Sequence, residues 1–337
     1  MMDYGVFKEL LKDKLPEYLP EGLKGAGVEL GHSDKVNVSF DTLVVHPTAG
    51  CRVSPSFNLD NMYRKYREGA GIEEILHEMA DKVRDTYERS QGMVDATDFG
   101  KLKDNVVMSL VNTEQNREFL KDKPHREFQD LSVIYRWIVG TGEEGIASVV
   151  VNDGMVKDLG MTADELFQTA VRNTKAMFPP KVTDMAEMMM GLLMPEGADP
   201  EMAAAFGSIM TELPPKERMW VITNEKGING ACSMLYEDIL HDLAKEVGTD
   251  LYILPSSIHE VIAISVETAD PETLTGMVQE VNMGVVSLEE RLSNNVYHYD
   301  KDLRTIQMAT DVPNKRLDGI VAEQPRLEGR QQGIPVK

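Results

Sequence analysis

The residues best suited to catalysis lie in one short stretch, LYILPSSIHEVIAI (251–264), between two apolar runs. Ser257, His259 and Glu260 supply a hydroxyl, a base and a carboxylate, the groups that a serine hydrolase uses. In an extended segment, however, residues two apart lie roughly 6 to 7 Å from each other, too far for a direct hydrogen bond. The strained G-x-S-x-G turn of many hydrolases is also absent here. The pattern therefore favours an ordinary Pro-Ser turn, and we predict no catalytic residues, with these three as the best candidates.

A second stretch, GTGEEG (140–145), has the glycine spacing of a nucleotide-binding loop. Such a loop joins a strand to a helix and binds phosphate through its backbone N–H groups. Here the glycines lead into the apolar run IASVVV, and Glu143 and Glu144 would repel a phosphate. The stretch is predicted to be a hairpin turn, and we expect no cofactor.

Two Glu/His pairs have the spacing of metal ligands on a helix: Glu74 with His77, and Glu237 with His241. A helical di-metal site needs two matched Glu-x-x-His elements and further carboxylates, and one such element is present. We therefore predict charged, solvated helix faces at both places and no metal site.

The candidates for a binding role are mainly methionines. The segment 181–215, KVTDMAEMMMGLLMPEGADPEMAAAFGSIMTELPP, lies between two halves with a similar order of elements. Flexible thioether side chains can line an adaptable binding surface, although such a segment can also be a helical insertion that covers a sheet. The predicted binding residues are Met188, Met189, Met190 and Met194, with His125 and Arg126 of DKPHREF as polar candidates that either line a pocket or pair locally.

Composition argues against several classes of protein. The 337 residues include 56 acidic and 35 basic side chains, a formal net charge of −21, which opposes binding to phosphate backbones and anionic lipid. The 2 cysteines are far apart, which argues against disulfides and structural zinc. No apolar run approaches the roughly 20 residues that cross a bilayer, and the first residues lack a signal peptide's apolar core. We expect a cytoplasmic protein that binds neither nucleic acid nor membrane directly.

Apolar spacing predicts an α+β fold. Residues 1–95 are expected to form a small α+β unit, and residues 96–310 a main α+β domain with the methionine-rich insertion at 181–215. Short links between adjacent strands favour a mixed, largely antiparallel sheet with flanking helices over a doubly wound parallel sheet. Residues 311–337, rich in Pro, Gly and Gln, are predicted to be a flexible tail.

Local signals mark several helix ends and turns. Thr162 and Glu165 have capping-box spacing, Gly248 is placed to end a helix, and Asp270 precedes a proline at a helix start. The stretch TNEKGING (223–230) is predicted to be a turn between two strands.

Four long stretches carry a family resemblance: NREFLKDKPHREFQDLSVIYRWIV, EGIASVVVNDGMVKDLGMTADELFQTAVRNT, WVITNEKGINGACSMLYEDILHDLAKEVGTDLYILPSSIHEVIAI and RLSNNVYHYDKD. Together they resemble domain of unknown function 5688, a family of gut Firmicutes, over most of residues 1–310. The order of elements from Ile146 onward is also similar to domain of unknown function 1444. Neither resemblance implies a reaction, so neither supplies catalytic residues.

Because every chemical motif fails in its context, we predict a binding or regulatory role with an unidentified protein partner. Two alternatives stay open. One is a hydrolase that uses Ser257 and His259; the other is an acidic mimic of a polyanion that inhibits a nucleic-acid-binding protein.

Overall fold

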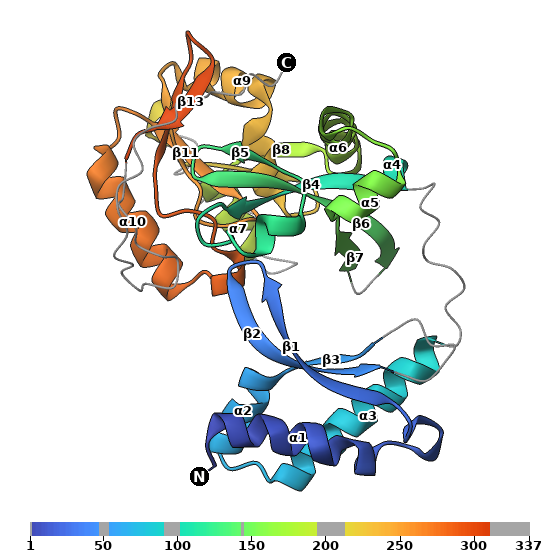
Figure 1. The fold of residues 1–337 in the computed structure, drawn as a ribbon. Coiled ribbons are helices and arrows are strands. Elements are labelled where there is room, and N and C mark those ends of the chain that lie inside the picture. The colour runs from blue at the N-terminus through green and yellow to red at the C-terminus, as the bar shows by residue number, and fades with distance from the viewer. Residues whose placement is uncertain (1, 47–53, 91–101, 143–144, 194–212, 311–337) are drawn as a thin grey trace. The chain divides into compact units, whose positions relative to one another are not determined.

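The computed structural model describes residues 2–46, 54–90, 102–142, 145–193 and 213–310, which fall into two compact units (Figure 1). The units comprise Met1–Asp98 and Phe99–Lys337. Every strand pair recorded in the described ranges is antiparallel. The chain therefore has the α+β fold, with largely antiparallel sheets, that the strand spacing predicts.

The first unit is a three-stranded sheet with helices packed against it (Figure 1). The strands run in the order β1 (Gly27–Lys35), β2 (Val38–His46) and β3 (Ser56–Asn58). The helices are α1 (Tyr4–Tyr18), α2 (Leu59–Arg67) and α3 (Ile72–Ser90), with a 3-10 turn, η1 (Glu21–Leu23). Four-residue spacing puts Phe7, Leu11 and Leu15 of α1 on one face, and all three are fully buried in the core of this unit.

The described part of the second unit contains two sheets. The smaller sheet pairs β6 (Leu131–Gly142) with β4 (Val106–Asn112), β5 (His125–Phe128) and β7 (Gly145–Val150). The larger one has the order β13 (Thr305–Met308), β12 (Tyr297–Asp300), β10 (Leu251–Leu254), β11 (Val261–Ser265), β9 (Trp220–Asn224) and β8 (Pro180–Asp184). Gly142 pairs with Gly145, so GTGEEG joins β6 to β7 as a hairpin connection, as predicted.

Several helices of the second unit begin or end where local chemistry indicates. The helices described in this unit are α4 (Leu102–Asn105), α5 (Asp153–Asp158), α6 (Ala163–Met177), α7 (Met185–Leu193), α9 (Glu237–Val247) and α10 (Pro271–Gly284), with 3-10 segments η3 (Phe119–Asp122), η4 (Pro215–Glu217), η5 (Gly230–Leu235) and η6 (Leu288–Glu290). The Thr162–Glu165 capping box is formed, Gly248 ends α9 with a φ of 86°, and Asp270 caps α10. Within the described ranges, none of these helices combines the length and apolarity needed to cross a bilayer.

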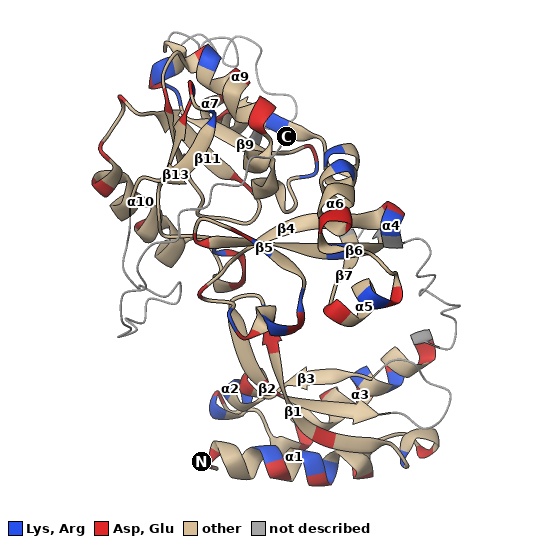
Figure 2. Ribbon diagram, turned by 45° about the horizontal axis from the view of Figure 1, so that its top comes forward, with Lys and Arg blue, Asp and Glu red and all other residues tan. Residues whose placement is uncertain are grey.

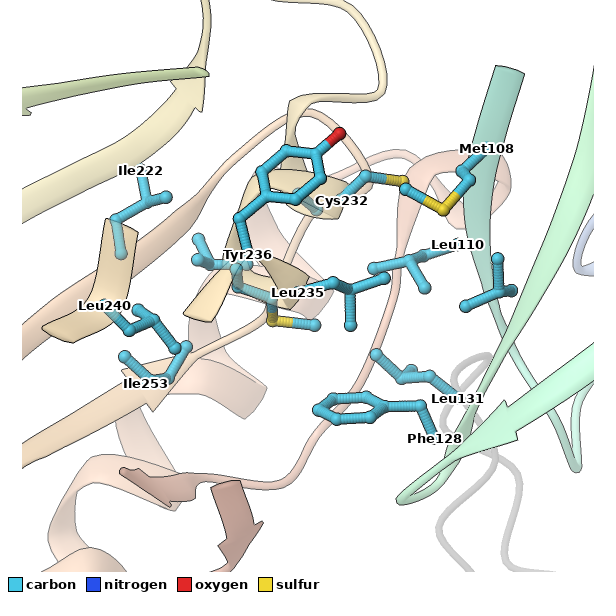
Figure 3. Close-up of a cluster of buried hydrophobic side chains, with 14 of the residues drawn as sticks. Met108, Leu110, Phe128, Leu131, Ile222, Cys232, Leu235, Tyr236, Leu240 and Ile253 are labelled. Atoms are coloured by element: carbon cyan, nitrogen blue, oxygen red, sulfur yellow. The ribbon is translucent and has the colours of Figure 1, made fainter. Parts of the chain in front are cut away.

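One apolar core joins the two sheets of the second unit (Figure 3). Met108 and Leu110 of β4 face Ile222 of β9 and Ile253 of β10, and side chains of η5 and α9 fill the space between. Full burial of one such side chain contributes about 1.5 to 3 kcal/mol, so this layer stabilises the arrangement of both sheets. On the other face of the larger sheet, α10 packs through Leu274 and Val278.

Two segments differ from the pattern expected of them. TNEKGING does not join two strands, because after β9 the chain enters the buried 3-10 segment η5. The methionine-rich segment begins inside the sheet, since 181–184 belong to β8 and pair with β9, and α7 follows directly. Residues 194–212 and the predicted tail, 311–337, lie outside the described ranges.

Candidate functional site

The Pro-Ser segment 255–259 connects β10 to β11, as its composition predicts. Ser257 is 5% exposed and forms a β-bridge with Arg291. Its Oγ accepts a hydrogen bond of 3.0 Å from the backbone N–H of His259. This is the local hydrogen bond of a serine turn, and among the described contacts the hydroxyl makes none to the imidazole ring.

The ring of His259 is held by residues distant in sequence. Its Nδ1 accepts a hydrogen bond of 3.3 Å from the backbone N–H of Asn229, so a neutral ring carries its proton on Nε2. That Nε2 lies 3.4 Å from Oε1 of Glu290. The carboxylate beside the ring is thus Glu290, and not the sequence neighbour Glu260, because η6 brings Glu290 alongside the 255–259 segment.

A tight loop presents Asn229 to this ring. The Asn224 side chain accepts hydrogen bonds from the N–H groups of Lys226 and Ile228 and donates one to the Ile228 carbonyl. Asn229 has a φ of 51°, a left-handed conformation that asparagine tolerates. Nothing in the local spacing distinguishes these contacts from an ordinary turn, so sequence reasoning missed their link to His259.

Gly230 lies where this loop packs closely against the 255–259 segment. A Cβ added there would lie 2.2 Å from Thr223 Oγ1, 2.4 Å from the His259 carbonyl oxygen and 2.8 Å from the Asn224 nitrogen. The Thr223 hydroxyl donates a 2.8 Å hydrogen bond to that same carbonyl. The His259 cluster, here Asn224, Asn229, Gly230, Ser257, His259 and Glu290, is therefore a closely packed polar junction. A hydrolase using Ser257 and His259 stays a prediction, and it would require a rearrangement that brings Ser257 Oγ to the ring.

His125 and Arg126 are neighbours on β5 but make separate contacts. His125 Nδ1 lies 2.8 Å from the carbonyl oxygen of Lys123. The Arg126 guanidinium lies 4.2 Å from the centre of the Phe167 ring and pairs with Asp164 at the start of α6. Adjacent strand residues point to opposite faces, so the two side chains do not converge on one pocket.

Three of the four candidate methionines can be placed on α7. Met188 and Met189 are 42% and 47% exposed, and Met190 is half-buried. From Met185 to Met190 no side chain is buried, although α7 carries a single charged residue over these positions, Glu187. Met194 lies outside the described residues. The structure therefore presents an apolar helix surface next to β8, the edge strand of the larger sheet.

The Glu/His pairs make contacts with protein groups. The His77 ring packs edge-on against Tyr18, with 4.9 Å between ring centres. Glu237 and His241 both contact the Arg304 guanidinium, at 3.0 and 2.8 Å. Over the described ranges, no group of three or more His, Cys, Asp and Glu side chains has a geometry that could hold a metal ion.

Acidic and basic residues are interleaved along the helices, as Figure 2 shows for α1 and α3. Several acids are paired with bases, among them Glu17 with Lys14 and Glu78 with Lys82. Hydrogen bonds from Lys65 and Lys82 hold the pKa of Glu78 below its usual range. That the protein mimics a polyanion stays a prediction, which a map of its surface electrostatic potential would test.

Over the described ranges, the fold and these contacts define an antiparallel α+β protein of two units, with a polar junction at His259 and exposed methionines on α7. A model described as a family of unknown function (DUF5688) matches residues 4–301, and the chain belongs to this family. No curated protein and no solved structure matches the chain. The similarity to domain of unknown function 1444 stays a prediction.

Proposed function

We propose that the protein's primary role is to bind another protein, with α7 as the contact element. The observation that supports this proposal is the exposure of α7: Met188 and Met189 are 42% and 47% exposed, and no side chain from Met185 to Met190 is buried. A helix on a globular domain normally buries an apolar stripe against its own core. From Met185 to Met190, the apolar side chains of α7 instead remain at least partly exposed and available to a partner.

The chemistry of α7 supports one kind of partner for this proposed role. Burial of apolar surface contributes about 25 cal/mol per Å², and methionine side chains adapt to irregular surfaces. An apolar helix of this kind fits a hydrophobic groove, with anchors at helical spacing. The partner should therefore offer an apolar groove, and the net charge of −21 favours a groove with a basic rim.

Site-specific photo-crosslinking tests this proposal in the full-length protein. A benzophenone amino acid replaces Met189, or, in the matched control, Met277 of α10, which is 48% exposed. We expect a discrete protein adduct at position 189 in cells that naturally express the protein, and none at 277. Excess unlabelled wild-type protein should compete the adduct away, whereas the double variant Met188→Glu/Met189→Glu should not.

The same double variant separates binding from folding. Because both side chains are exposed, we expect its free energy of unfolding to stay within about 0.5 kcal/mol of wild type. Equal adducts at both positions, or undiminished competition by a well-folded double variant, would show that α7 is not the contact element.

A further inference from the structure

The β1–β2 hairpin brings four polar side chains onto one face of the first unit. The strand register places His32 opposite Asp41 and Asp34 opposite Ser39. Alternate residues of a strand project from the same face, and directly opposite residues have neighbouring side chains. The four residues are thus neighbours although none of them belongs to a recognisable sequence motif.

Three of these side chains have the geometry of a nucleophile, a base and an orienting carboxylate. The Oγ of Ser39 lies 2.8 Å from Nε2 of His32, and Nδ1 of His32 lies 3.1 Å from Oδ1 of Asp41. Both distances are within hydrogen-bond reach, and such a triad is recognised by geometry and roles, independently of fold or residue order.

The carboxylate of Asp41 is kept in the required ionised form. Lys8 of α1 donates to Asp41 Oδ2. Hydrogen bonds from Lys8, and then from His32, lower the pKa of Asp41 below its usual value. An ionised Asp41 accepts the Nδ1 proton of a neutral His32, which leaves Nε2 free to accept the proton of Ser39.

We propose that Ser39 and His32, with Asp41 as the positioning residue, form a serine-nucleophile site that hydrolyses small, activated carboxylic esters. This site shares no residue with α7 or with the His259 cluster. Ser39 is exposed and the His32 side chain is 57% exposed, so a small ester can reach both. Because water is not excluded, the reaction suits good leaving groups, such as phenolates, and not amides.

The reaction proceeds in two steps. In the first, Ser39 Oγ bonds to the ester carbonyl carbon as His32 Nε2 takes the hydroxyl proton, and the C–O bond to the leaving group breaks as His32 returns that proton to it. In the second, His32 Nε2 takes a proton from water, whose oxygen bonds to the acyl carbon. The bond to Ser39 then breaks, Oγ receives the proton and a carboxylic acid leaves.

Asp34 competes for the Ser39 proton. The Ser39 hydroxyl donates a hydrogen bond to Asp34 Oδ1, which lies 3.6 Å from His32 Nε2. A hydroxyl that donates to Asp34 is turned away from its base. Removal of the Asp34 carboxylate should therefore increase the nucleophilicity of Ser39 and the hydrolysis rate. If the cluster had only a structural role, removal of Asp34 would not raise that rate.

Ester hydrolysis and active-serine labelling test the proposal on the full-length chain. The probes are p-nitrophenyl acetate and a fluorophosphonate, with the labelled residue located by peptide mass spectrometry. We expect labelling at Ser39 and a hydrolysis rate that falls about 100-fold in Ser39→Ala and in His32→Gln, in line with the effect of a positioned base. Asp34→Ala should raise the rate several-fold.

Ser33→Ala is the matched control, because Ser33 lies next to His32 on β1 and points to the other face of the hairpin. It should keep the wild-type rate, and all variants should keep the wild-type unfolding temperature. The proposal is overturned if Ser39 is unlabelled in both the wild-type protein and Asp34→Ala, or if Ser39→Ala hydrolyses the ester as fast as Ser33→Ala.

Discussion

At the scale of single residues, Gly230 is the described glycine at which an added Cβ would meet the closest neighbours. A Cβ there would meet Thr223, His259 and Asn224 at 2.2 to 2.8 Å, and two of these contacts are backbone atoms that cannot rotate away. We expect Gly230→Ala to lower the free energy of unfolding by about 1 to 3 kcal/mol, measured by urea denaturation. The change should also separate the 224–230 loop from the His259 ring.

Gly276→Ala provides the control for this prediction. Gly276 lies inside α10, where an added Cβ would meet nothing within 4 Å. Alanine in a helix is about 0.5 to 1 kcal/mol more favourable than glycine, so this variant should be slightly more stable than wild type. If both variants unfold at the same urea concentration, the close packing around Gly230 does not require a residue without a Cβ.

At the scale of elements, a carboxylate links the β5–β6 turn to the strand β12. Asp130 accepts hydrogen bonds from Ser293 (2.6 Å), Asn295 (3.0 Å) and the Tyr297 hydroxyl. Burial, followed by the nearby Asp130 charge, raises the pKa of Tyr297 well above its usual value, so its hydroxyl stays a donor. This contact connects the smaller sheet to the larger one.

Two tyrosines on β12 allow a matched test of that link. Tyr297→Phe removes a hydrogen bond to a charged group and should cost about 1.5 to 3 kcal/mol. Tyr299 is equally buried, and its hydroxyl has no hydrogen-bond partner in the described part of the chain. Tyr299→Phe should therefore be neutral or stabilising in the same denaturation experiment. A larger loss in Tyr299→Phe than in Tyr297→Phe would refute this account of the Asp130 contacts.

At the scale of the whole molecule, the two units have separate cores. The buried residues of the first core lie between Phe7 and Val83, and those of the main second core between Val106 and Tyr299. Units of this size can fold alone when each buries its own apolar side chains. We expect fragments 1–98 and 99–337 each to unfold cooperatively on heating, monitored by circular dichroism. A fragment with helical signal but no cooperative transition would show that its core depends on the other unit.

The sequence by itself determined the α+β class, several helix ends, the GTGEEG hairpin and the family. Helix ends were predictable wherever the signal is local: the Thr162–Glu165 box, Gly248 and Asp270 each act on backbone groups within one helical turn. The hairpin at GTGEEG was equally predictable, because its glycines stand between two β-branched runs.

Only the tertiary structure decided which polar side chains meet. Glu290 reaches His259 across 31 positions, and Asn229 reaches it across 30. Ser39, His32 and Asp41 come together because the β1–β2 register places His32 opposite Asp41. If that register shifted by one residue, His32 would project from one face of the hairpin, and Ser39 and Asp41 from the other. Such contacts depend on strand pairing and chain packing, which residue spacing does not specify, whereas helix caps and turns depend on neighbouring backbone groups alone.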